Sequence, residues 1–145
     1  MTQKEALDLL MMGRNVYLTG QAGSGKTYLL NVYIDFLKKN KVGVAITAST
    51  GIAATHLNGS TIHSWSAIGI KSNLTDQDLS KIAFNINTRA RIQAAKVLII
   101  DEISMLHSYR LEMVNQVCKK IRQNAEPFGG LQIILCGDFF QLPPI

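Results

Sequence analysis

The stretch GQAGSGKT at residues 20–27 limits the folds open to this chain more than any other feature. It fits the pattern G-x-x-x-x-G-K-[ST], in which a glycine-rich turn leads from a β-strand into an α-helix and surrounds phosphate groups with backbone N–H donors. The turn needs glycine because a Cβ would block the phosphates, and the start of the helix adds positive potential. Segments 15–19 and 26–40 provide the expected strand and helix. We therefore predict a nucleoside triphosphate site; a structural turn that matches by chance is the alternative.

Strands and helices alternate along the rest of the chain, which predicts an α/β fold. The apolar runs KVLII (96–100) and LQIIL (131–135) are typical of parallel strands that are covered on both faces. A further strand is expected at 42–47, and helices are expected between Thr2 and Gly13, within 49–59, over 75–84 and over 108–124. We expect one three-layer P-loop NTPase domain over 1–145, with a mostly parallel central sheet.

Composition excludes several classes of protein. A chain of 145 residues with 47% hydrophobic and 17% charged residues can fold around one core. No apolar run approaches the roughly 20 residues that span a bilayer, so no membrane partner is expected. The two cysteines lack CxxC spacing, and a buried free thiol at Cys136 favours a reducing compartment such as the cytoplasm. The net charge of +5 favours a polyanionic partner, but only weakly.

Two carboxylates follow the predicted strand 96–100, in the sequence KVLIIDEIS. Ligands of such sheets bind at the carboxyl ends of the strands, where Asp101 would hold hydrated Mg²⁺. Glu102 would orient and deprotonate an attacking water. An acidic start to an ordinary loop is the alternative, and the phosphate-binding turn makes the catalytic interpretation stronger.

ATP with Mg²⁺ is the predicted cofactor. The guanine-specific sequence NKxD is absent, and a glutamate directly after the Mg²⁺ aspartate favours hydrolysis by water. Lys26 would reach the β- and γ-phosphates, and the Thr27 hydroxyl would be the second Mg²⁺ ligand. The residues expected to contact the nucleotide around the turn are Gly20, Ala22, Gly23, Ser24, Gly25, Lys26, Thr27 and Tyr28.

Five stretches together resemble the PIF-like (petite integration frequency) DNA helicases, relatives of RecD in superfamily one. They are GQAGSGKT, TASTGIAA, GSTIHSW, DEISML and GDFFQLPPI, in the order and at the spacing of that family. The resemblance implies the first of two RecA-like motor domains, which couples ATP hydrolysis to 5′-to-3′ translocation on single-stranded DNA and to unwinding at duplex junctions. The second domain, with its arginines, would follow residue 145. Because a missing arginine finger can cost ~10³–10⁵-fold in turnover, we expect this chain alone to be nearly inactive.

The resemblance also implies roles for single residues. Gln3 takes the place of an adenine-reading glutamine, and Gln141 that of a glutamine that senses the γ-phosphate and acts with Lys26 and Glu102 in catalysis. For Trp65, stacking on a base and packing in the core are equally open. His63 suits DNA better than a metal, because the three histidines lack metal-ligand spacing. The segment implied to contact single-stranded DNA contains Thr47, Ser49, Thr50, Gly51, Thr61, His63 and Trp65.

Two other functions stay open, a DNA-dependent ATPase that does not unwind and a regulatory nucleotide-binding module. A family member would lie in the bacterial cytoplasm at the nucleoid, or in the nucleus or mitochondria of a eukaryote. DNA repair, recombination, replication and telomere maintenance are all compatible with the motifs.

Overall fold

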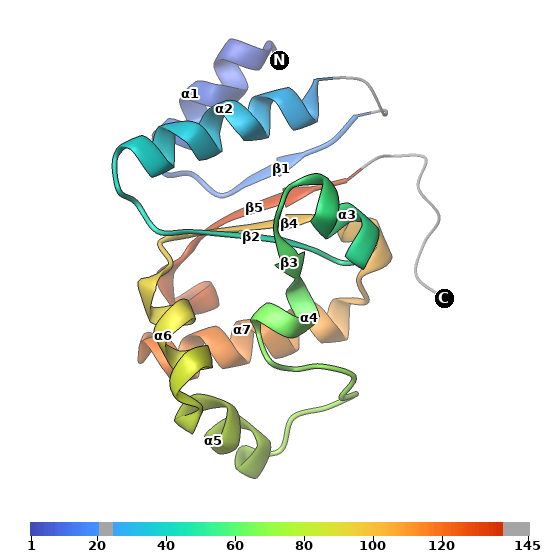
Figure 1. Cartoon of the computed structure of the whole chain (residues 1–145), viewed down its shortest axis with the longest axis vertical. Helices are drawn as coiled ribbons and strands as arrows, with labels where there is room; N and C mark the ends of the chain where they lie inside the picture. Colours follow the sequence, from blue (N-terminus) through green and yellow to red (C-terminus); the bar gives the residue numbers. More distant parts are fainter. Residues whose placement is uncertain (21–24, 138–145) are drawn as a thin grey trace.

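Parallel strands form the centre of the molecule (Figure 1). The computed structural model describes residues 1–20 and 25–137, and within these ranges five strands make one sheet in the order β1-β5-β4-β2-β3. All four neighbouring pairs are parallel, as predicted from the apolar runs. The strands are β1 (Val16–Leu18), β2 (Val44–Ala48), β3 (Ser60–Thr61), β4 (Val97–Asp101) and β5 (Gln132–Cys136).

Helices cover both faces of the sheet, which gives the three layers expected of a P-loop NTPase (Figure 1). On one face lie α1 (Gln3–Met11) and α2 (Lys26–Lys39). The other elements are α3 (Gly51–His56), α4 (Ile62–Trp65), α5 (Asp76–Phe84), α6 (Ile86–Ala94) and α7 (Ser108–Arg122), with short 3-10 turns η1 (Ile103–Met105) and η2 (Pro127–Gly130).

The buried strand β4 separates two hydrophobic cores. Val97 and Ile99 pack in the core under α1 and α2, whereas Leu98 and Ile100 pack in the core with α5, α6 and α7. This alternation follows from the period of two in a strand, whose successive side chains point to opposite faces. Apolar residues therefore follow one another without interruption in β4, because both faces of the strand are covered.

Local signals at the helix ends explain most of the boundaries. Thr2 and Thr75 begin α1 and α5 with complete capping boxes. Gly13 follows the end of α1 with φ +81°, a left-handed conformation that glycine adopts without steric cost. The predicted helices at these places are confirmed.

The structure contains two helices and one strand that the sequence did not predict, namely α4, α6 and β3. Asn85 caps α6 by accepting a hydrogen bond from the Thr88 N–H at 3.0 Å. Only Thr88 and Ile92 of this helix are buried, so its sequence carries no apolar stripe. β3 has two residues, too few for a visible alternation.

The buried face of α2 differs from the apolar face that helical spacing predicts, which is Leu29, Val32, Tyr33, Phe36 and Leu37. Phe36 is 37% exposed and stacks on Tyr33 with ring centroids 6.2 Å apart. Leu30 and Ile34 are buried instead. The helix contacts α1 as well as the sheet, so its buried face is wider than a single stripe.

Both cysteines are free and buried, as expected for Cys136. Burial raises the pKa of the Cys118 thiol to about 12 and that of Cys136 further. No helix within 1–20 and 25–137 has the length and apolarity that crossing a bilayer requires.

Candidate active site

The carboxyl ends of β1, β4, β2 and β5 meet at one edge of the sheet, where the sequence places its chemistry. Lys26 begins α2 directly after Gly25, which has φ +93°. The Lys26 Nζ donates to the carbonyl oxygens of Gly20 and Gly137, both at 2.8 Å. These carbonyls follow β1 and β5, so the tertiary fold holds the ammonium group between two strand ends. Thr27 and Tyr28 are exposed on the first turn of α2, next to this point.

The predicted acidic pair lies at the end of β4. The Glu102 N–H donates to Asp101 Oδ1 at 2.8 Å. Burial is the main cause that raises the pKa of the Asp101 carboxyl, and the negative charge of Glu102 adds to it. The hydrogen bond from the Glu102 N–H and the positive charge of Lys26 lower this pKa, so Asp101 lies within electrostatic reach of the lysine. A carboxylate such as that of Asp101 and a hydroxyl such as that of Thr27 are hard oxygen donors of the kind that suits Mg²⁺.

Glu102 adopts a left-handed conformation, with φ 52° and ψ 48°. For a residue with a Cβ this costs about 1 kcal/mol or more, so the surrounding contacts must hold it there. The Ser49 hydroxyl donates to the Glu102 carbonyl oxygen at 2.6 Å, and the Thr50 hydroxyl donates to Glu102 Oε2 at 2.8 Å. The residues after β2 and β4 are thus joined at the site.

A pocket of about 340 Å³ adjoins the described part of the phosphate-binding turn. The Gln3 side-chain amide lies so close to Gly25 that a Cβ at position 25 would collide with it. This places the predicted adenine-reading residue beside the nucleotide turn. The pocket is lined by Met1, Thr2, Gln3, Ala6, Tyr17, Leu18, Thr19, Gly25, Lys26 and Leu29.

Two residues expected to contact DNA point into the protein instead. Thr47 is 0% exposed, and its hydroxyl donates to the Ile99 carbonyl oxygen at 2.7 Å, which joins β2 to β4. Trp65 is 7% exposed and packs in the core that contains Ile62. The burial of these two side chains does not support direct contact with DNA, and for Trp65 it agrees with the alternative of packing in the core.

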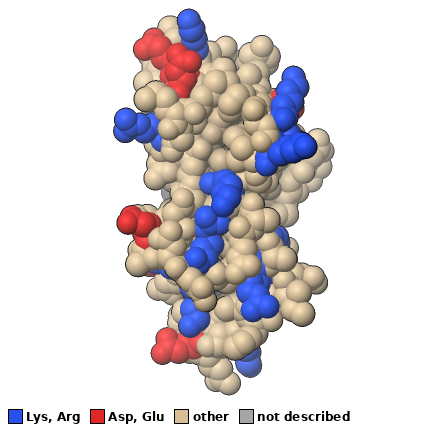
Figure 2. All heavy atoms as spheres, turned by 90° about the vertical axis from the view of Figure 1, so that its left-hand side faces the viewer, with Lys and Arg blue, Asp and Glu red and all other residues tan. Residues whose placement is uncertain are grey.

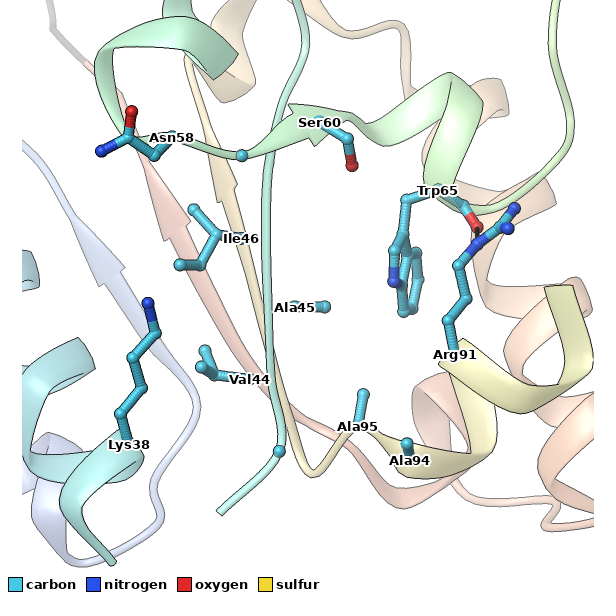
Figure 3. A pocket seen from close by; sticks show the side chains of 12 residues that line it. Lys38, Val44, Ala45, Ile46, Asn58, Ser60, Trp65, Arg91, Ala94 and Ala95 are labelled. Atoms are coloured by element: carbon cyan, nitrogen blue, oxygen red, sulfur yellow. Dashed lines mark hydrogen bonds between the residues drawn. The ribbon is translucent and has the colours of Figure 1, made fainter. Parts of the chain in front are cut away.

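Figure 3 shows that Trp65 instead forms one wall of a groove along β2, with Lys38 on the other side. The groove has a volume of about 480 Å³. Arg91 Nε donates to the Trp65 carbonyl oxygen at 2.8 Å, which fixes α4 against α6. Lysines and arginines outnumber acidic residues on the face of the molecule to which the end of α2 and helix α6 contribute (Figure 2).

The remaining candidates for DNA contact lie nearer the surface. Thr50 and Thr61 are the N-caps of α3 and α4, and Ser49 and Gly51 flank Thr50. His63 lines a hollow of about 480 Å³ together with Thr61 and Arg110. Burial is the main cause that lowers the pKa of His63, and the positive charge of Arg110 lowers it further.

Sequence reasoning missed Arg110, because it lies on α7, far from the predicted DNA segment in the sequence. Its Nη1 donates to the carbonyl oxygens of Gly69 and Lys71, at 3.3 and 2.9 Å, and its guanidinium lies 5.4 Å from the centre of the Tyr109 ring. Arg110 thereby attaches the loop after α4 to α7. A basic residue next to an aromatic at the start of a helix was the only signal in the sequence.

Four predicted site residues lie outside the described ranges: Ala22, Gly23, Ser24 and Gln141. Among the described residues, no group of three or more His, Cys, Asp or Glu side chains could hold a metal ion.

Comparison with known proteins shows which family the chain resembles. A family model described as PIF1-like helicase matches residues 2–145. The chain is 61% identical over 145 residues to the ATP-dependent DNA helicase Pif1 of Psychrobacter sp. (strain PRwf-1), covering 100% of this chain and 22% of the relative. It is 46% identical over 148 residues to the ATP-dependent DNA helicase RRM3 of Saccharomyces cerevisiae, covering 100% of this chain and 20% of that relative. The chain spans about a fifth of the length of these relatives.

Solved structures show the same architecture. The crystal structure of Pif1 helicase from Candida albicans matches with a TM-score of 0.91 and 41% identity, over 99% of this chain and 33% of that one. Pif1 helicase from Bacteroides, in complex with ADP-AlF3 and single-stranded DNA, matches with a TM-score of 0.82 and 35% identity. The match covers 100% of this chain and 34% of that one.

Proposed function

The chain belongs to the PIF1-like helicase family, and from this premise we propose that it is the first of two RecA-like motor domains of an ATP-dependent DNA helicase. The observation that carries the proposal is the convergence of Lys26, Asp101 and Glu102 at one edge of the sheet, with Glu102 hydrogen-bonded to the segment after β2. The proposed ATP site and the proposed DNA segment share a contact there, which supports a motor that couples the two.

ATP would lie with its phosphates over Gly20–Thr27 and its adenine in the pocket that contains Gln3. Lys26 already makes two hydrogen bonds to carbonyl oxygens, so its ammonium is held in place before any phosphate arrives. The Gln3 amide can both donate to and accept from adenine. Ala22, Gly23, Ser24 and Tyr28 would complete the contacts.

Asp101 and Thr27 would hold Mg²⁺, which neutralises charge on the phosphates when bound. Glu102 would accept the proton of the attacking water, because its backbone is held at the end of β4 and its carboxylate lies at the same edge. Gln141 would sense the γ-phosphate. The second motor domain would supply the arginines that stabilise the transition state, so this chain alone should turn over ATP very slowly.

Single-stranded DNA would cross the surface formed by Ser49, Thr50, Gly51, Thr61 and His63. Short hydroxyl donors suit phosphate oxygens, which account for a large share of contacts between proteins and nucleic acids. Pif1 helicases from Bacteroides have been solved with single-stranded DNA, and two coordinating Pif1 helicases at forked duplex DNA. Forked junctions are therefore the proposed substrate, and 5′-to-3′ the proposed polarity.

A helicase of this kind would work where DNA lies, in the nucleoid, the nucleus or mitochondria. Repair, recombination, replication and telomere maintenance are the processes in which such unwinding serves.

The test is ATP turnover by the longer protein that carries this chain, with and without a single-stranded oligonucleotide and with Glu102→Gln as the blank. Forked duplexes with a single 5′ or 3′ overhang then report unwinding and polarity. Strong stimulation by DNA with unwinding from the 5′ overhang is expected. Stimulation without unwinding would favour a non-helicase ATPase, and turnover indifferent to DNA would favour a regulatory module.

A further inference from the structure

The hydrogen bond between Thr50 and Glu102 joins the proposed DNA surface to the proposed catalytic base. Thr50 Oγ1 donates to Glu102 Oε2 at 2.8 Å, and the two residues are 52 positions apart in the sequence. Both side chains are partly buried, so water screens the contact only in part. Hydrogen bonds to a charged carboxylate are stronger than those between neutral groups.

The backbone of Glu102 is held by two hydrogen bonds that do not involve its carboxylate. Its N–H donates to Asp101 Oδ1 at 2.8 Å, and its carbonyl oxygen accepts from the Ser49 hydroxyl at 2.6 Å. A rotation of the side chain therefore changes where the carboxylate points and leaves β4 and the Mg²⁺ ligand unchanged.

A threonine hydroxyl has a single O–H donor. In Thr50 that donor is used on Glu102, while the oxygen also accepts from the Ala53 N–H at 3.3 Å as the N-cap of α3. A phosphate oxygen that accepted the Thr50 O–H would have to take it from Glu102. The two acceptors exclude each other, because they compete for one hydrogen.

We propose that Thr50 is a positioning residue that restrains the Glu102 carboxylate, and that a DNA phosphate which takes the Thr50 O–H releases this carboxylate toward the attacking water. DNA binding and ATP turnover are then coupled through one hydrogen atom. The inference rests on the proposed function, since it requires DNA to cross the segment after β2.

Thr50→Val tests the proposal in the longer protein, because valine has nearly the shape of threonine but no donor. We expect its DNA-free ATP turnover to rise by about tenfold, the factor that corresponds to a hydrogen bond of about 1.4 kcal/mol. The ratio of turnover with DNA to turnover without it falls by a similar factor. Thr50→Ser keeps the donor, so its ratio of turnover with DNA to turnover without it should be higher than that of Thr50→Val.

Loss of the helix cap needs separate controls. Thr75 caps α5 far from the site and accepts from the Asp78 N–H at 3.1 Å, so Thr75→Val removes a comparable cap and should leave DNA-free turnover unchanged. Thr50→Gly also removes the donor, and glycine is well tolerated at an N-cap, so this variant should also raise DNA-free turnover. It serves if Thr50→Val does not fold.

The outcomes separate this inference from the proposed function. An equal fall in turnover with and without DNA would mean that Thr50 holds Glu102 in its working position, which overturns the inference. Weaker DNA binding with unchanged DNA-free turnover would leave Thr50 as a DNA contact alone and also overturn it. If the original protein shows no stimulation by DNA, the proposed function itself fails.

Discussion

The edge of the sheet proposed to bind the nucleotide (the nucleotide edge) and the predicted DNA segment meet at Glu102. They differ in how well the sequence motifs predict where their side chains lie. At the nucleotide edge, the described residues that the motifs indicate reach the site: Lys26, Asp101 and Glu102 stand at the ends of strands or the start of a helix. In the DNA segment, Thr47 and Trp65 turn inward. A phosphate site built on backbone turns depends on local geometry, whereas a surface depends on which side chains the neighbouring helices leave uncovered.

The largest effect is expected at the nucleotide edge. Lys26→Ala removes the ammonium held between Gly20 and Gly137, and we expect nucleotide affinity to fall by a factor of about 100 or more, consistent with the loss of a hydrogen-bonded charge on phosphate. Titration of this chain with a fluorescent ATP analogue measures it. Lys39→Ala, on the last turn of α2, is the matched control. Retained affinity in Lys26→Ala would place the nucleotide elsewhere.

Glu102→Gln should separate binding from chemistry. The amide keeps the shape of the side chain but cannot accept a proton, so turnover by the longer protein should fall by roughly 10²–10⁴-fold with nucleotide affinity nearly unchanged. Steady-state turnover and equilibrium binding are measured on the same preparation. If turnover survives, another group is the base.

Trp65→Ala tests whether this side chain of the predicted DNA segment contributes to stability instead of DNA binding. The indole packs against the core that contains Ile62 and Ile68, so the substitution should lower the free energy of unfolding by about 3–5 kcal/mol. Urea denaturation of this chain, followed by circular dichroism, gives the value. A loss of DNA affinity with stability unchanged would return Trp65 to the DNA surface.

His63→Ala should show the opposite pattern, with the smallest effect. DNA affinity is expected to fall by about threefold to tenfold while stability changes little, because His63 is only half-buried and lines a surface hollow. Fluorescence anisotropy with a labelled oligonucleotide measures affinity. A change in thermal stability alone would assign His63 to the core.

The same residue predicts a dependence on pH. Its pKa is lowered below 6.5 by burial and by Arg110, so the folded protein disfavours the charged imidazole. The unfolded chain binds this proton more readily, and the contribution of His63 to stability, fully present above pH 6.5, is lost as pH falls below it. In His63→Ala this part of the acid destabilisation should disappear.

What the sequence determined by itself is the set of features that depend on neighbours along the chain. The glycine turn, the acidic pair after KVLII and the start of a helix after Thr2 each involve a few consecutive residues, and the apolar runs indicated a parallel sheet. The helix α6 escaped prediction because its two buried residues leave no stripe.

Tertiary structure alone decided the contacts between residues far apart in the sequence. The direction of Thr47 follows from the pairing of β2 with β4, and the burial of Trp65 from α6 and the core beside it. The Thr50–Glu102 hydrogen bond exists because β2 and β4 end side by side in register, Ala48 opposite Asp101. Spacing along the chain cannot encode such pairs, since their distance is set by which strands become neighbours in the sheet.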